Sequence, residues 1–107
     1  MILHADLEAG LVTLIDPSDF GGFHVEVAGG DVTDGRLETV LAPHGRLHDG
    51  HAWIALDAVA TLAGEAADDQ WRAGFDAMVA YARDNRFLNA SGTTIRAHLE
   101  PARPPVV

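Results

Sequence analysis

The sequence predicts an α+β domain, with a mainly antiparallel sheet and two to three helices packed on one face. Short runs of alternating apolar and polar residues lie near both ends of the chain, and a long stretch of helical periodicity precedes the last of them. The 107 residues fit one compact domain, which we assign to residues 1–100. Residues 101–107 (PARPPVV) are expected to form an extended or disordered tail, because proline opposes regular structure.

The N-terminal third predicts three strands. Residues 2–6 (ILHAD) and 11–15 (LVTLI) are short β-prone runs separated by LEAG, which predicts a hairpin with Gly10 in its turn. Residues 23–27 (FHVEV) alternate strictly, as a half-buried strand requires. One face of this strand then carries Phe23, Val25 and Val27, and the other carries His24 and Glu26.

Helices are expected mainly in the second half. Thr33 is a candidate cap for a short helix containing Leu37, Val40 and Leu41, and Asp57 is a candidate cap for a helix ending near Gly64.

The longest helix is predicted over residues 68–84. Its apolar stripe, which we expect in the core, comprises Trp71, Phe75, Met78, Val79 and Ala82. Residues 92–100 (GTTIRAHLE) alternate again, which favours a final strand.

Composition excludes several classes of protein. The chain has no cysteine and no lysine, so it has no disulfide, no thiolate metal site and no lysine Schiff base, and the sequence predicts no cofactor. A formal net charge of −9 repels phosphate backbones, so no nucleic-acid partner is expected.

The N-terminus lacks a basic region, and no apolar run is long enough to span a membrane. We therefore expect a cytoplasmic protein without a membrane partner.

Three of the six histidines lie in PHGRLHDGH, residues 43–51. Asp49-Gly50 is a strong signal for a type I′ hairpin, which would pair His48 with His51 across the ladder. Arg46 would then face Trp53, on the same side as the two histidines. The neighbouring imidazoles suggest a metal site formed by His44, His48 and His51, although clustered histidines beside a turn are commonly only solvated.

A second candidate site combines residues far apart in sequence. His24 and Glu26 fall on the polar face of one predicted strand, and Arg96, His98 and Glu100 fall on that of another. If the strands are neighbours, these groups form a titratable cluster in which a carboxylate could orient a histidine for acid–base chemistry. The alternative is ordinary cross-strand pairing of opposite charges.

Two functions follow as hypotheses. The first is protein association, as a homodimer or as an accessory subunit with a protein partner, through an open sheet face or the aromatic helix stripe. The second is a small-molecule or divalent-metal site in the histidine-rich hairpin, with acid–base chemistry by histidine. No motif decides whether the chain is an enzyme.

Overall fold

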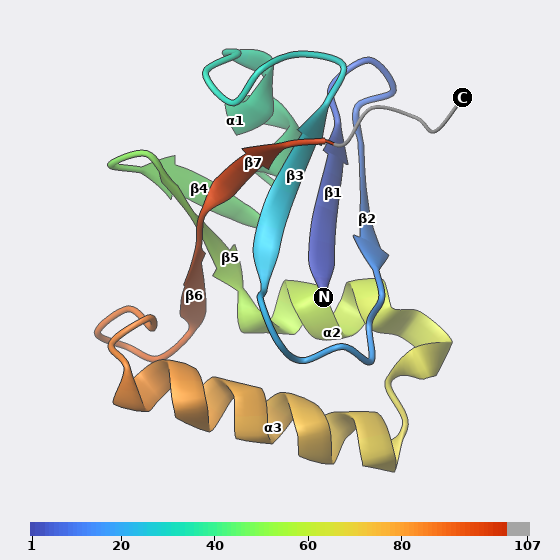
Figure 1. Cartoon of the computed structure of the whole chain (residues 1–107), viewed down its shortest axis with the longest axis vertical. Helices are drawn as coiled ribbons and strands as arrows, with labels where there is room; N and C mark the ends of the chain where they lie inside the picture. The colour runs from blue at the N-terminus through green and yellow to red at the C-terminus, as the bar shows by residue number, and fades with distance from the viewer. Residues whose placement is uncertain (103–107) are drawn as a thin grey trace.

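The α+β class is confirmed by a computed structural model, which describes residues 1–102 (Figure 1). Within this range, seven strands form two sheets and three α-helices accompany them. The first sheet has the order β2-β1-β3-β7, with strands β1 (Ile2–Asp6), β2 (Leu11–Ile15), β3 (His24–Ala28) and β7 (Leu99–Pro101). The second has the order β4-β5-β6, with strands β4 (Gly45–His48), β5 (His51–Ala55) and β6 (Thr94–Ala97). The helices are α1 (Arg36–Leu41), α2 (Leu56–Ala63) and α3 (Asp69–Asp84), and a 3₁₀ turn spans Gly64–Ala66.

The first sheet is mixed, which the sequence did not indicate. Strands β1 and β2 form the predicted antiparallel hairpin, and Gly10 in its turn has a φ of 67°. However, β3 pairs with β1 in parallel, and β7 pairs with β3 in parallel. These pairings join segments distant in sequence, which neither alternation nor turn chemistry specifies.

The predicted Asp49-Gly50 hairpin is confirmed by strands β4 and β5. Both turn residues have positive φ, 52° for Asp49 and 76° for Gly50, as a type I′ turn requires. The register places His48 opposite His51 and Arg46 opposite Trp53. Strand β6 adds to the other side of β5, so that Trp53 faces Arg96 as well.

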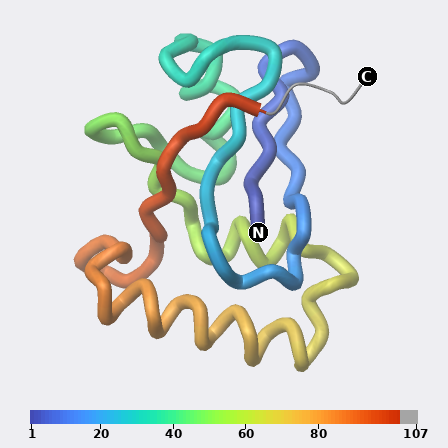
Figure 2. Tube along the Cα trace, in the orientation of Figure 1, coloured from blue at the N-terminus to red at the C-terminus, as the bar shows by residue number. Residues whose placement is uncertain are grey.

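The final strand predicted from alternation is divided between the two sheets. Strand β6 pairs with β5, whereas β7, which follows after His98, pairs with β3. The trace in Figure 2 runs directly from one into the other. Pro101 is the last residue of β7, contrary to its assignment to an irregular tail, because an edge strand tolerates the missing N–H of proline. Residues 103–107 of the predicted tail lie outside the described residues.

A single hydrophobic core lies between the sheets and helices. Leu3, Ala5, Val25 and Val27 face it from the first sheet, and each is at most 1% exposed. The apolar stripe of α3 belongs to this core, as predicted: Trp71, Phe75, Met78 and Ala82 are buried and Val79 packs against them. In Figure 1, α3 crosses beyond the lower ends of the strands, so it closes one end of the domain.

Neither of the two predicted helix caps, Thr33 and Asp57, is confirmed, and the helix that does have a side-chain cap is α3, for which no cap was predicted. Asp68 caps α3, since its carboxylate accepts a hydrogen bond from Trp71 N–H at 2.8 Å. Thr33 does not cap α1, because its hydroxyl donates to Asp31 at 2.6 Å, and Gly35 takes the cap position. Asp57 does not cap α2 either. The chain enters that helix directly from β5, so Ala55 is the cap and Asp57 lies in the first turn, where a negative charge favours the helix dipole.

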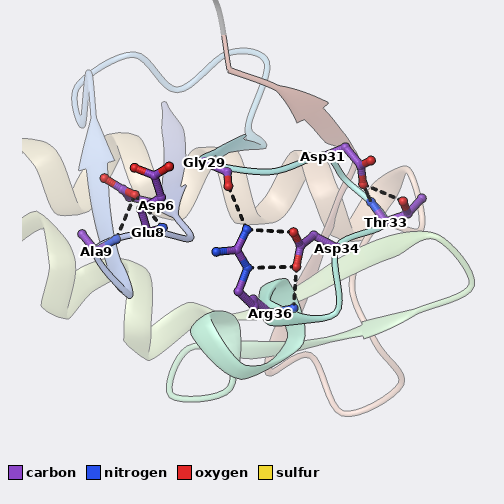
Figure 3. A network of polar contacts seen from close by, with 8 residues as sticks. All are labelled: Asp6, Glu8, Ala9, Gly29, Asp31, Thr33, Asp34 and Arg36. Atoms are coloured by element: carbon purple, nitrogen blue, oxygen red, sulfur yellow. Dashed lines mark hydrogen bonds and ion pairs between the residues drawn. The ribbon is translucent and has the colours of Figure 1, made fainter.

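Aspartate side chains organise the loops at one end of the first sheet (Figure 3). Asp6 accepts hydrogen bonds from the backbone N–H groups of Glu8 and Ala9, at 3.0 and 3.1 Å. Arg36 donates to both carboxylate oxygens of Asp34, and it also donates to the carbonyl of Gly29 at 2.8 Å. The backbone N–H of Arg36 also donates to Asp34, at 2.9 Å. The hydrogen bonds that the Arg36 side chain and backbone donate to Asp34 lower the pKa of its carboxyl to about 2.

The Asp34–Arg36 contact should stabilise the fold only where Asp34 is ionised. A depressed pKa contributes stability above the unfolded value, near 3.8, and this contribution is lost as the pH falls toward 2. We expect Asp34→Asn to lower the melting temperature at pH 6, with the difference from wild type shrinking as the pH falls from about 4 through 2. Asp76→Asn, at an exposed position of α3, is the control and should show no such change. An Asp34→Asn deficit as large at pH 2 as at pH 6 would contradict this assignment.

Candidate functional site

A row of polar side chains crosses the face of the first sheet that points away from the core. The strand register places Thr13, His4, Glu26 and Glu100 side by side, one from each of β2, β1, β3 and β7. His24 lies on the same face, two residues before Glu26 along β3. The parallel pairings therefore gather imidazoles and carboxylates from distant parts of the sequence.

Glu26 is buried, although it carries a carboxylate. Its residue exposure is only 8%, and it is the one buried polar or charged residue within residues 1–102. The carboxylate lies 3.6 Å from Nδ1 of His4 and 4.0 Å from Nε2 of His24. A buried carboxylate is costly without a counter-charge, and the imidazoles of His4 and His24 supply one only when they are protonated.

The two ring nitrogens of His24 have different surroundings. Nδ1 lies 2.8 Å from the carbonyl oxygen of Gly22, and since a carbonyl only accepts, Nδ1 carries a proton. Nε2 is buried without a hydrogen-bond partner in the described chain, 3.3 Å from a carboxylate oxygen of Glu100. A neutral His24 would thus direct its lone pair toward the Glu100 and Glu26 carboxylates, which is unfavourable unless a cation lies between them.

His98 completes this cluster from the segment that joins β6 to β7. Its ring stacks on that of His24, with centroids 5.2 Å apart, and its Nε2 lies 2.8 Å from Glu100. One donor atom from each of His24, His98 and Glu100 lies within 4.8 Å of the others. We call these three residues the donor triad. The structure thus brings together the His24, Glu26, His98 and Glu100 cluster expected from the sequence.

His4 belongs to the same cluster but was missed in the sequence analysis. Its Nδ1 is buried without a hydrogen-bond partner in the range that the structure describes, as is Nε2 of His24. The alternation of β1 already places His4 opposite to the buried Leu3 and Ala5. The missing information was the parallel pairing of β1 with β3, which puts His4 beside Glu26.

The histidines of the hairpin are arranged differently. His48 and Asp49 form an exposed ion pair at 3.2 Å, and His51 Nδ1 lies 3.2 Å from the backbone carbonyl of Asp49. Over residues 1–102, the donor triad is the one group of three metal-ligating side chains with converging donors, and it does not include His44, His48 or His51. The structure therefore does not gather the three predicted hairpin ligands.

Arg96 makes no ion pair with the carboxylate cluster within residues 1–102, although the sequence analysis placed it there. Its guanidinium stands over the ring of Phe87, 5.0 Å from the ring centroid. Arg96 and His98 line a pocket of about 470 Å³, which also includes His51 from the hairpin. The pocket thus adjoins the cluster through His98.

Comparison of the chain with protein-family models, curated proteins and solved structures finds no match. No helix in the described part of the chain is long and apolar enough to cross a membrane. The functional argument therefore rests on the geometry of the cluster and of the adjoining pocket.

Proposed function

We propose that the protein binds a divalent first-row transition metal ion through the donor triad. The observation that carries this proposal is the convergence of two imidazole nitrogens and a carboxylate within 4.8 Å. One oxygen of Glu100 lies 3.3 Å from His24 Nε2 and the other lies 2.8 Å from His98 Nε2, whereas neighbouring ligands of a tetrahedral zinc ion are roughly 3.4 Å apart. Metal binding would therefore require these side chains to adjust until one donor atom of each faces the ion.

The surroundings of His24 Nε2 favour a cation. Carboxylate oxygens of Glu26 and Glu100 lie 4.0 and 3.3 Å from this nitrogen, so negative charge approaches it from two strands. Glu26 would then act from outside the ligand set by balancing part of the charge of the ion.

The hydrogen bond from His24 Nδ1 to Gly22 also suits a metal ligand. Metal-bound histidines usually donate their second ring nitrogen to a carbonyl or carboxylate, which fixes the ring orientation. Imidazole and carboxylate donors suit zinc and its first-row neighbours. Three protein ligands leave at least one coordination position open, as in sites where a metal binds water or a small molecule.

Zinc binding should depend on the triad and not on the hairpin. We expect calorimetry to show one zinc ion per chain and the visible spectrum of bound Co²⁺ to report nitrogen and oxygen ligands. His98→Ala removes a ligand, so it should weaken zinc by more than the roughly 10- to 100-fold loss typical of outer-shell substitutions. His48→Ala is the matched control, because both side chains are half-exposed or more, 54% for His98 and 66% for His48.

Two results would overturn the proposal of a triad metal site. The first is no saturable binding of Zn²⁺ or Co²⁺ by the folded wild-type protein. The second is a loss of binding in His48→Ala while His98→Ala binds zinc as wild type does. That result would show that the metal binds to the hairpin histidines.

Self-association is a second candidate function, and the edge strand β2 supports it. Strand β2 pairs with β1 alone in the described chain, and its sequence LVTLI has none of the charges or prolines that protect natural sheet edges. Leu11 is 61% exposed and Ile15 is 37% exposed on its outward face. A second copy pairing through the same edge would cover both residues and create a two-fold symmetric dimer.

A dimer through β2 should dissociate when this edge carries a charge. We expect light scattering to give a dimer for wild type and a monomer for Leu11→Lys, since each lysine would place a charge in an otherwise apolar interface. Tyr81→Lys is the control, because Tyr81 is comparably exposed, at 65%, but lies on α3. A wild-type monomer at high micromolar concentration would count decisively against this assignment.

A further inference from the structure

The pocket beside the donor triad is lined by several separate parts of the chain, including His51 of β5 and Arg96 of β6. The loop before β3 contributes Phe20 and Phe23, the second half of α3 contributes Met78, and the segment after α3 contributes Phe87. Its volume of about 470 Å³ falls in the range of roughly 300–1,000 Å³ found for small-molecule sites. Gly74 of α3 allows the loop to approach, because a Cβ there would lie 2.3 Å from the ring of Phe20.

The polar side chains that line this pocket are Arg96, His51, His98 and Tyr81, and each of them can donate a hydrogen bond. The lining contains Arg96, His51 and His98 but no aspartate or glutamate, although the chain has 16 acidic residues and a net charge of −9. The side chains of this pocket therefore carry no negative charge, whereas the protein as a whole is acidic. The pocket would attract an anion, while its aromatic wall would bury an apolar body.

The guanidinium group of Arg96 is available to bind that anion. Its guanidinium carbon lies 5.0 Å from the ring centroid of Phe87, and the guanidinium makes no ion pair with a carboxylate within residues 1–102. A guanidinium without a carboxylate partner keeps its paired N–H donors available for a planar carboxylate. Arg36, by contrast, is already engaged with Asp34.

We infer that this pocket binds a small organic carboxylate with an apolar body, and that Arg96 receives the carboxylate. The apolar part of the ligand lies against Phe20, Phe23 and Phe87. This inference goes beyond the proposed metal site and does not require it, because the Arg96 contact needs no metal. His98 joins the two sites, so a ligand in the pocket lies next to the triad.

The test is an NMR titration of the full chain with 3-phenylpropionate in the presence of EDTA. We expect saturable shifts of amide signals around the pocket, and binding of the neutral 3-phenylpropionamide at least about tenfold weaker, because the charge-assisted contact is lost. Arg96→Gln should weaken the carboxylate by a similar factor and leave the amide unchanged. Arg46→Gln is the matched control: Arg46 flanks the same Trp53 from the opposite strand and does not line the pocket.

Each contrary outcome would overturn the inference. Absence of saturable shifts, equal affinity of wild type for the carboxylate and the amide, or an Arg96→Gln affinity within twofold of Arg46→Gln would do so. The comparison of carboxylate with amide uses wild type alone, so it holds even if Arg96→Gln fails to fold. Because EDTA removes free metal, failure here leaves the metal site standing, and carboxylate binding without zinc binding would overturn only the metal site.

Discussion

The parallel pairing of β3 with β7 is the interaction on which the cluster and its surroundings depend. It aligns Val25 with Leu99 and Glu26 with Glu100, and Val25 N–H donates to the carbonyl of His98 at 3.0 Å. The C-terminal segment thereby joins the N-terminal sheet, while β6, just before it, stays in the second sheet. His98 lies at this junction and reaches both the triad and the pocket.

The same pairing explains how the domain can hold a buried carboxylate. Glu26 and Glu100 are cross-strand neighbours, and two like charges in that relation destabilise a sheet. The imidazoles of His4, His24 and His98 surround the pair and offset part of this repulsion when they are protonated or hold a cation. Such an arrangement contributes less to folding than an apolar face would, and it is the kind of local conflict that proteins keep at functional sites.

Local signals allowed much of the fold to be predicted. Asp49-Gly50 specified the β4–β5 turn through its tolerance of positive φ, and the spacing of Trp71, Phe75 and Met78 specified the buried face of α3. Thr33 was misassigned because the carboxylate of the nearby Asp31 accepts the hydrogen bond of its hydroxyl.

The parallel strand pairings were not predictable from the sequence, since no short-range pattern encodes them. His4 was missed for that reason, whereas the His24, Glu26, His98 and Glu100 cluster was expected only on the condition that the strands were neighbours.

The most direct test of the central claim is ¹⁵N NMR of the histidine rings during a titration with Zn²⁺. The account predicts that Nδ1 of His24 is protonated before and after zinc is added, since it donates to Gly22 throughout. Nε2 of His24 should take the chemical shift of a metal-bound nitrogen at one equivalent, one ring nitrogen of His98 should do the same, and His44, His48 and His51 should remain unchanged. Shifts confined to the hairpin histidines, or a proton on Nε2 of His24 that zinc fails to displace, would contradict it.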